Sequence, residues 1–257
     1  MKEASLGTMV MVVPTYNEVD NLEWIVGRLR KAVPETDVLV VDDQSPDGTG
    51  VLADKLAEDD AQVHVLHRTA KEGLGAAYLD GFRVALEREY DVIGEMDADG
   101  SHLPEQLPRL ISALAGADLV LGSRWVPGGS VTNWPRFRQS LSRGGNAYTR
   151  LMLGIPVRDA TGGFRLFRRT TLEALDLHTV DSTGYCFQAD LAWRTVAAGL
   201  RVREVPIEFV ERVRGRSKMT PQVAVESLRR ITAWGLRERG RQIRDVLSRR
   251  TSSPEKR

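Results

Sequence analysis

The first half of the chain alternates short apolar runs with longer amphipathic stretches. Residues 9–13 form a continuous apolar run that ends at Pro14, a pattern typical of a strand buried on both faces. Similar runs predict further strands at residues 38–41, 63–66, 91–96 and 118–121. Apolar residues at helical spacing predict four helices in this half of the chain. One begins near residue 22, the next ends near residue 59, and the other two cover residues 75–89 and 104–115. This alternation favours right-handed βαβ units and a mostly parallel sheet.

The first predicted helix begins soon after the first strand. Leu22, Ile25, Val26 and Leu29 share one helical face, and Asn17 is placed to cap the start of this helix. Together with the strand pattern, this predicts a Rossmann-like α/β fold.

The pattern loosens after residue 122. Residues 126–135 form a glycine- and proline-rich loop, a candidate active-site segment. Helices are predicted at residues 138–153 and 185–198, and strands near residues 164–167 and 202–209. A last helix, over about residues 221–247, precedes a polar tail that we expect to be disordered. We therefore expect a main domain over residues 1–220, followed by a basic C-terminal helix and tail over residues 221–257.

The composition is that of a globular chain, with 42% apolar residues and a formal net charge of +1. Net charge selects no class of partner, although the segment from Arg212 onward has fourteen Lys or Arg and only four Asp or Glu. The single cysteine, Cys186, excludes an internal disulfide and a cysteine-based metal site, and we expect it to be buried. We find neither a signal-peptide pattern nor the ~20 apolar residues that span a bilayer, so we expect folding in the cytoplasm.

Three polar clusters follow predicted strands, at residues 14–18 (PTYNE), 42–45 (DDQS) and 97–99 (DAD). In doubly wound sheets, ligands bind where the carboxyl ends of the strands meet. One such cluster is explained by a turn or a helix cap. Three clusters that converge on one edge favour a functional site.

The cluster at residues 97–99 has the chemistry of a metal site. Asp97 and Asp99 are two residues apart, so in an extended segment their carboxylates point the same way. A hard divalent cation relieves their repulsion, and Mg²⁺ completes its coordination with water and phosphate oxygens. The pair therefore suggests a metal–diphosphate site, although the same spacing also occurs in ordinary turns.

The other clusters add groups that suit a nucleotide. Glu18 and Asp43 offer hydrogen-bond acceptors for ribose hydroxyls and a base, and Tyr16 offers an aromatic face. Gly73 and Gly75 open a predicted helix and invite a phosphate-binding interpretation. Without the rest of a dinucleotide fingerprint, tight packing between helix and strand is the favoured reason for these glycines.

Several separate segments, in order from residue 10 to about residue 218, resemble the polyprenol (dolichol) phosphate mannosyltransferases of glycosyltransferase family 2. The segments are PTYNE (14–18), VDDQSPDGT (41–49), DADGSH (97–102), GSRW (122–125), SRGGN (142–146), DATGGFR (159–165), GYCFQ (184–188) and ERVRGRSKM (211–219). The resemblance implies the A-type glycosyltransferase fold, GDP-mannose as donor and a polyprenyl phosphate as acceptor. Residues 1–220 would then be the catalytic domain.

The resemblance also implies roles for the matching residues. The guanosine would be held by Pro14, Tyr16, Glu18, Val41 and Asp43. The diphosphate would be held by Asp97, Ala98 and Asp99, with Asp97 and Asp99 as ligands of Mg²⁺ or Mn²⁺. The donor phosphates and sugar would be contacted by Arg124, Arg212 and Lys218. The acceptor phosphate would be received by Arg138 and Ser142. Catalysis would rest on Asp99, Arg124, Arg138 and Lys218.

The substrates define the expected chemistry. An ionised acceptor phosphate attacks the anomeric carbon without a general base, and direct displacement inverts the configuration. Some relatives have Gln where this chain has Ser101, so a third protein ligand to the metal is in doubt and water is an alternative. His102 is either a metal ligand or a capping or surface residue.

Two alternatives remain open from the sequence. A sister enzyme that uses UDP-glucose on the same lipid phosphate would share the fold and the metal site. A non-catalytic nucleotide-binding scaffold would not need Asp99 or Arg138. A nucleic-acid partner is not expected, because the basic tail lacks a recognised reader motif.

A polyprenyl acceptor requires access to a membrane. We expect a peripheral protein on the cytoplasmic face, attached through its basic C-terminal segment or through an integral-membrane partner. In the first case, an apolar stripe of Ile231, Trp234, Ile243 and Val246 would lie among arginines, as in interfacial helices. The alternative for this segment is a solvated helix face.

Overall fold

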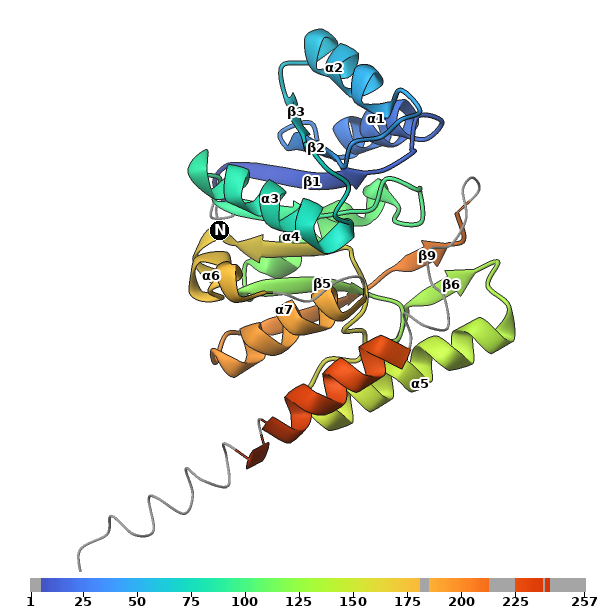
Figure 1. The fold of residues 1–257 in the computed structure, drawn as a ribbon, viewed down its shortest axis with the longest axis vertical. Coiled ribbons are helices and arrows are strands. Elements are labelled where there is room, and N and C mark those ends of the chain that lie inside the picture. Colours follow the sequence, from blue (N-terminus) through green and yellow to red (C-terminus); the bar gives the residue numbers. More distant parts are fainter. Residues whose placement is uncertain (1–5, 181–184, 213–224, 238, 241–257) are drawn as a thin grey trace, which may run out of the picture.

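The computed structural model describes residues 6–180, 185–212, 225–237 and 239–240, whose arrangement is shown in Figure 1. The main sheet has the strand order β3-β2-β1-β4-β7-β5-β8. Its strands are β1 (Met9–Thr15), β2 (Asp37–Asp42), β3 (Val63–His67), β4 (Val92–Glu95), β5 (Leu119–Ser123), β7 (Arg165–Arg168) and β8 (Val202–Pro206). Strand β7 is antiparallel to both of its neighbours, and the other pairs in this sheet are parallel. The predicted mostly parallel α/β fold is confirmed.

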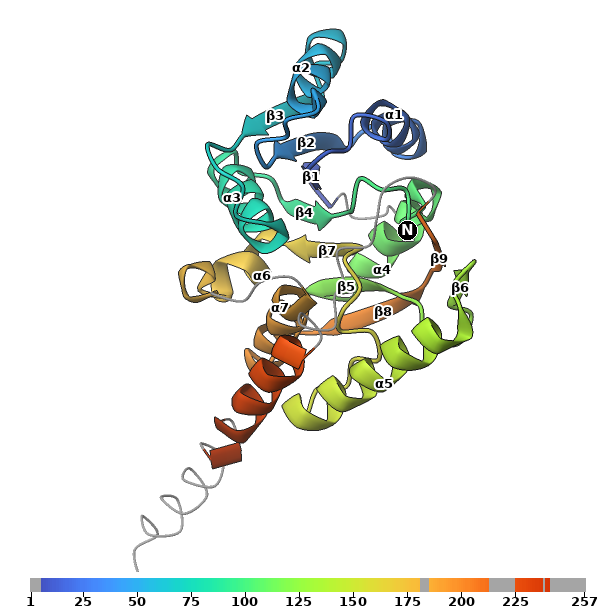
Figure 2. The ribbon, with the colours of Figure 1, turned by 45° about the vertical axis from the view of Figure 1, so that its right-hand side comes forward.

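Helices cover both faces of the sheet (Figures 1 and 2). On one face lie α1 (Leu22–Ala32), α2 (Thr49–Asp59) and η1–α4 (Pro104–Gln106 and Leu107–Leu114). On the other lie α3 (Leu74–Glu87), α6 (Arg169–Ala174), η2 (Leu177–Thr179) and α7 (Tyr185–Ala197). Alternate residues of β1 supply the two cores: Met11 and Val13 face one, and Val10 and Val12 face the other. This burial on both faces explains why the strands are apolar throughout.

A smaller unit lies beside one end of the sheet. Strand β6 (Ser130–Thr132) pairs in parallel with β9 (Glu208–Val210), so part of the predicted loop at residues 126–135 is a short strand. Helix α5 (Arg136–Leu153) runs alongside helical residues 225–237, hereafter the C-terminal helix (Figures 1 and 2). The hydroxyls of Tyr148 and Thr232 join the two helices at 2.5 Å. Sequence periodicity did not predict β6 or α6, which are only three and six residues long.

Two local expectations for the first strand and helix were wrong. Asn17 does not cap α1: it has a φ of 57°, and Asn21 takes the N-cap position. Residues 18–21 form a turn first, in which the Glu18 carbonyl accepts the N–H groups of Asn21 and Leu22. Strand β1 also continues through Pro14, opposite Val41 of β2. The missing N–H of Pro14 is tolerated because the last register pair between β1 and β4 is Val12 with Glu95.

The C-terminal helix turns its expected apolar stripe toward the protein. The Ile231 side chain is 4% exposed, and the Trp234 ring stacks on Trp193 of α7 at 6.1 Å between centroids. The expectation that Ile231 and Trp234 form a membrane-facing stripe is therefore wrong, because α7 offers them an apolar surface. Ile243 and Val246 lie outside the described residues. Within the described part of the chain, no helix combines the length and apolar character needed to cross a membrane.

Candidate active site

The three polar clusters converge on one cavity of about 320 Å³ at the carboxyl ends of β1, β2 and β4. Its wall includes Pro14, Tyr16, Glu18, Asp43, Asp97, Ala98, Asp99 and Arg212. The sequence-based expectation that these clusters share one edge of the sheet is therefore confirmed. Val41 is different, because its side chain is buried in the core beneath α3.

Asp97 and Asp99 both line this first cavity but differ in their surroundings. The Asp97 side chain is 32% exposed and accepts a hydrogen bond from the Tyr78 hydroxyl at 3.2 Å. The Asp99 carboxylate is 8% exposed, accepts the Ser101 N–H at 3.0 Å and forms an ion pair with Arg212 at 3.0 Å. Two carboxylates on one wall fit a Mg²⁺ or Mn²⁺ ion that takes its other ligands from water and phosphate. The described residues contain no group of three or more candidate ligands.

Ser101 and His102, which lie shortly after this pair, are buried structural residues. Ser101 is 1% exposed, and its carbonyl accepts the Val210 N–H from β9. His102 is also 1% exposed, stacks on Phe164 and accepts the Asp97 N–H on its Nδ1 atom at 3.2 Å. Burial lowers the pKa of His102 to about 4, so the ring is neutral near pH 7. A surface role for His102 was wrong, and the ring instead fixes the loop that presents Asp97.

Asp43 is held by residues that the sequence alone did not single out. Its carboxylate accepts the N–H groups of Glu72 at 3.2 Å and Gly73 at 2.9 Å. The buried guanidinium of Arg68 forms an ion pair with the same carboxylate and a further one with Asp80 at 2.7 Å. These contacts fix the orientation of Asp43 at the end of the cavity where the resemblance predicts that the base binds.

Gly73, which precedes α3, does not have the packing role that the sequence favours. Gly73 has a φ of 95°, and a Cβ atom there would meet nothing within 4 Å. Its backbone conformation, which directs the N–H to Asp43, is the reason for glycine. The close helix–strand contact lies instead at Gly81, where an added Cβ would collide with the Val12 side chain of β1.

A lysine accompanies the aromatic residue of the first cavity. The Nζ atom of Lys71 lies 3.6 Å from the centre of the Tyr16 ring, and both residues line the cavity. This is a cation–π contact. Glu18, on the same wall, accepts a hydrogen bond from the Asn21 amide at 2.8 Å.

A second cavity, of about 180 Å³, adjoins the first between the β7 side of the sheet, α5 and the C-terminal helix. The two cavities share four wall residues, namely Asp97, Thr161, Gly163 and Arg212. Polar residues of the second cavity include Arg124, Arg138 and Ser142, and apolar ones include Leu141, Phe209, Leu228 and Ile231. The structure thus brings the two predicted sets of residues to contiguous spaces, while Lys218 lies outside the described residues.

Arg124 is anchored by a residue without an assigned role, Asp159. The Nε and Nη2 atoms of Arg124 donate to the Asp159 carboxylate at 2.8 and 2.6 Å, and the Arg124 backbone N–H donates at 2.8 Å. Asp159 is fully buried and also receives the Asn146 amide at 3.4 Å. Its own N–H donates to Glu204 at 2.9 Å. This buried pair gives the Arg124 guanidinium one orientation in the wall of the second cavity.

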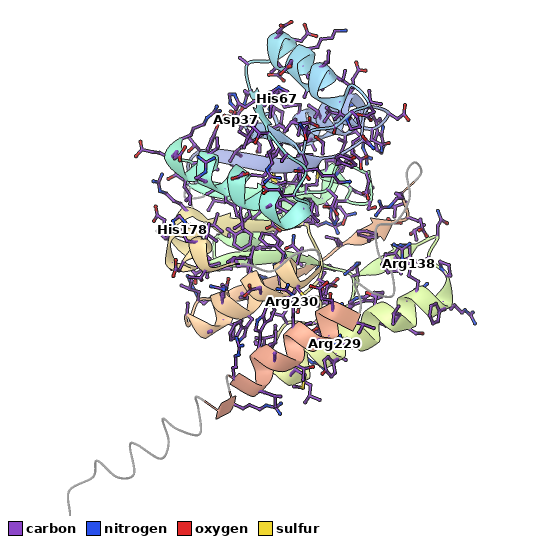
Figure 3. All side chains as sticks on the ribbon, viewed as in Figure 1. Asp37, His67, Arg138, His178, Arg229 and Arg230 are labelled. Atoms are coloured by element: carbon purple, nitrogen blue, oxygen red, sulfur yellow. The ribbon has the colours of Figure 1, made fainter. Side chains whose placement is uncertain are left out.

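Arg138 projects from the first turns of α5 (Figure 3). It forms an ion pair with Glu211, and its guanidinium lies 4.1 Å from the centre of the Trp134 ring. Both contacts come from segments that flank β6 and β9. Arg138 is therefore held in the second cavity by a charge and by an aromatic face.

A buried polar layer supports the turn between the two cavities. Arg165 is fully buried and donates to the carbonyls of Ala160, Gly162 and Gln188, each at 2.7 Å. Glu95 lies 3.8 Å from Arg165, and burial raises the pKa of this carboxyl to about 7. These bonds fix residues 160–163, including Gly163, where an added Cβ would lie 3.7 Å from the Asp97 carboxylate.

Comparison with known proteins shows the family of this chain. Residues 10–176 match the Glycosyl transferase family 2 model. An undecaprenyl-phosphate mannosyltransferase from Micrococcus luteus is 55% identical over 92% of this chain and 97% of its own length. A polyprenol monophosphomannose synthase from Mycolicibacterium smegmatis is 54% identical over 93% of this chain and 91% of its own.

Solved structures with lower identity share the fold. One is a glucosyl-3-phosphoglycerate synthase from Mycobacterium tuberculosis in complex with Mn²⁺, UDP and glucosyl-3-phosphoglycerate. Its TM-score is 0.64 at 20% identity, and the match covers 91% of this chain and 80% of the synthase chain. A mannosyltransferase from Pyrobaculum calidifontis, in complex with GDP-Man and Mn²⁺, has a TM-score of 0.54 at 20% identity and covers 82% and 58% of the two chains. The matched residues and the two curated relatives show that this chain belongs to glycosyl transferase family 2.

Proposed function

We propose that the chain transfers mannose from GDP-mannose to a polyprenyl phosphate, with inversion, to give polyprenyl β-mannosyl phosphate and GDP. The observation that carries this proposal is the contiguity of the two cavities through Asp97 and Arg212. One cavity has a pair of carboxylates suited to a divalent cation, which would bind a nucleotide diphosphate. The other combines arginines with apolar side chains, as an anionic lipid requires. The two relatives, an undecaprenyl-phosphate mannosyltransferase and a polyprenol monophosphomannose synthase, support the acceptor class.

Asp97 and Asp99 would hold the divalent cation, Mg²⁺ or Mn²⁺. When bound, the cation supplies positive charge that neutralises the leaving diphosphate. Asp43, fixed by Arg68 and the Gly73 N–H, would accept hydrogen bonds from the base. The Tyr16 ring would lie near the nucleoside, and Lys71 beside it would add a positive charge.

The acceptor phosphate provides the nucleophile. One of its oxygens forms a bond to the anomeric carbon of mannose, while the bond from that carbon to the diphosphate oxygen breaks and GDP leaves. The phosphate is already ionised near neutral pH, so no side chain has to remove a proton. Arg124 and Arg138 would hold the acceptor phosphate and the donor phosphates in line, with the help of Ser142, Arg212 and Lys218.

The orientation of Arg124 is central to this role. Asp159 fixes the guanidinium through two hydrogen bonds and accepts a third from the Arg124 backbone N–H, so little conformational entropy is lost when an anion binds. We also propose that the protein works as a peripheral protein at the cytoplasmic face of a membrane, where the acceptor resides. An integral-membrane partner would provide the same access.

A panel of donors tests the substrate assignment. We would measure initial rates with GDP-mannose, UDP-glucose and GDP-glucose, a short-chain polyprenyl phosphate, and either Mg²⁺ or Mn²⁺. The expected result is efficient transfer from GDP-mannose alone, with a raised KM for this donor in Asp43→Asn. Exclusive use of UDP-glucose would reject the mannosyl assignment, and binding of GDP without product under every condition would favour a scaffold.

A further inference from the structure

A third cavity, of about 530 Å³, is lined on α5 mostly by residues other than those that line the second cavity. Three arginines contribute to its wall: Arg143 and Arg150 from α5, and Arg158 from the segment before β7. Trp125 and the turn at residues 126–129 form much of the remaining wall, and no Asp or Glu among the described residues lines it. We call this space the arginine cavity.

The three arginines keep their charge available to a ligand. In the described part of the chain, none of these three side chains forms an ion pair, and all three are exposed. The Arg143 guanidinium lies 4.7 Å from the centre of the Trp125 ring, which holds it at the cavity wall without neutralising it. By contrast, Arg124 and Arg138 are both paired with carboxylates. Concentrated positive charge of this kind attracts phosphate groups.

Two residues that line the same space, Asn146 and Trp125, each carry a buried polar atom without a hydrogen-bond partner among the described residues. The Asn146 side chain is 2% exposed, and its Oδ1 atom has no hydrogen-bond partner among the described residues. The indole Nε1 of Trp125 is likewise buried and unpartnered within that part of the chain. Asn146 lines both the second cavity and the arginine cavity, so the two spaces share a wall.

Exposed apolar side chains lie next to the arginines on α5. Phe137 is 77% exposed, Leu141 50% and Leu151 68%. Arg136, Arg143 and Arg150 recur every seven residues, close to two helical turns, and so form one row beside these apolar residues. The neighbouring C-terminal helix adds exposed side chains of the same kind at Val225, Leu228 and Leu236, together with Arg229, which is labelled in Figure 3.

We propose that the arginine cavity binds the phosphate of an anionic phospholipid headgroup, and that the exposed apolar side chains of α5 and the C-terminal helix enter the adjoining bilayer. Exposed apolar residues beside a row of arginines are the composition of an interfacial helix, and anionic lipids complement the charge. This site is distinct from the two cavities of the proposed transfer reaction. It places the bilayer beside the second cavity, which opens among Leu141, Leu228 and Ile231.

Flotation with lipid vesicles tests this proposal without any substrate, so its failure is distinguishable from failure of the proposed transfer activity. The test variant is Arg143→Ala/Arg150→Ala/Arg158→Ala. The matched control, Lys55→Ala/Arg83→Ala/Arg109→Ala, removes the same charge from exposed positions on α2, α3 and α4. Vesicles of phosphatidylcholine, with and without phosphatidylglycerol, separate charge recognition from apolar insertion.

We expect the test variant to bind phosphatidylglycerol vesicles on the order of 10²-fold more weakly than the wild type, and the control variant to bind nearly as well as the wild type. Transfer to a short-chain acceptor in detergent should be unchanged in the test variant. Equal losses in the two variants would show that binding follows net charge alone and would overturn the proposal. If the triple variant fails to fold, Arg150→Glu with its matched control Arg109→Glu takes its place.

A competition arm separates a lipid headgroup from a soluble phosphate. Inorganic phosphate and glycerol phosphate are titrated against wild-type protein bound to phosphatidylglycerol vesicles. We expect displacement only at concentrations that also screen charge, because the soluble ligands lack the apolar anchor. Tight binding of inorganic phosphate that depends on the three arginines, with unchanged vesicle binding in the test variant, would contradict a lipid site.

Discussion

Replacing Asp159 by Asn removes one negative charge from beneath Arg124 while keeping the size of the side chain. In the wild type, one carboxylate oxygen accepts the Arg124 N–H and Nε, each at 2.8 Å, and the other accepts Arg124 Nη2 at 2.6 Å and the Asn146 amide at 3.4 Å. An Asn retains one acceptor oxygen and turns its NH₂ group toward two donors. Each lost bond to a charged group costs about 1.5–3 kcal/mol.

These losses predict that Asp159→Asn lowers the free energy of unfolding by about 3–5 kcal/mol, as expected when a buried ion pair loses one partner. In a chain of this length, the melting temperature should fall by roughly 6–20 °C. The control is Asp118→Asn, which weakens the exposed Asp118–Arg201 pair and should cost at most about 1 kcal/mol. Urea unfolding followed by circular dichroism measures both variants.

The same substitution should also slow the transfer reaction, because Arg124 loses its fixed orientation. The expected fall in kcat/KM for the acceptor is about 10–100-fold, as for other residues that orient a functional group. Rates are measured with saturating GDP-mannose and varied acceptor, at a temperature where the variant is folded. The reasoning is refuted if Asp159→Asn is no less stable than Asp118→Asn and has an unchanged acceptor KM.

Three further substitutions, one of them with a matched control, test other parts of the account. Asp99→Ala should lower kcat about 10²–10³-fold at saturating metal, and wild-type turnover would reject the metal-site assignment. Gly81→Ala should destabilise the fold by about 1–3 kcal/mol, because the added Cβ collides with Val12. The control Gly27→Ala, whose Cβ meets nothing within 4 Å, should stabilise α1 by about 0.5–1 kcal/mol. Changes of the same sign in the two variants would contradict this reasoning. His102→Asn should remove part of the pH dependence of stability. The pKa of this histidine is 6.5 in the unfolded chain and about 4 in the folded protein. The wild type should therefore lose stability relative to the variant as the pH falls from 6.5 to about 4. A pH-independent difference in urea unfolding between the two proteins would count against the buried neutral ring.

The strands and most helices could be predicted from the sequence because burial on both faces leaves long apolar runs. The convergence of residues 14–18, 42–45 and 97–99 could also be predicted, since it follows from the topology of parallel strands. Strands β6 and β9 are short and pair across a large sequence separation, so their pairing is a tertiary feature. The start of α1 was misplaced because the turn at residues 18–21 precedes the helix, which puts Asn21 at the N-cap position without a side-chain capping hydrogen bond.

The residues that hold the site were harder to predict than the residues that line it. Arg68 and Asp159 act through Asp43 and Arg124, and neither has a local spacing that reveals its partner. Asp159 does lie in the segment DATGGFR, which was recognised as a motif but carried no role. For the C-terminal helix, the sequence shows an apolar stripe but not whether protein or lipid covers it. Packing of Trp234 on Trp193 decides that question for one face.

The unused charge on α5 has a physical consequence for the proposed reaction. Arg124 and Arg138 are paired with Asp159 and Glu211, so their charge acts locally on an anion inside the second cavity. Arg143 and Arg150 have no such carboxylate in the described part of the chain, and their charge extends to the surface. Helix α5 can therefore present Arg138 to a substrate phosphate and Arg143 and Arg150 to a lipid headgroup.

The most direct test of the central claim is the structure of the product made from GDP-mannose and a short-chain polyprenyl phosphate. The wild-type protein is incubated with both substrates and Mg²⁺ or Mn²⁺, and the purified product is examined by ³¹P and ¹H nuclear magnetic resonance. We predict polyprenyl mannosyl phosphate in the β configuration, formed in equal amounts with GDP and lost on chelation of the metal. An α-linked product, or full activity with excess chelator, would contradict direct displacement at a site organised by Asp97 and Asp99.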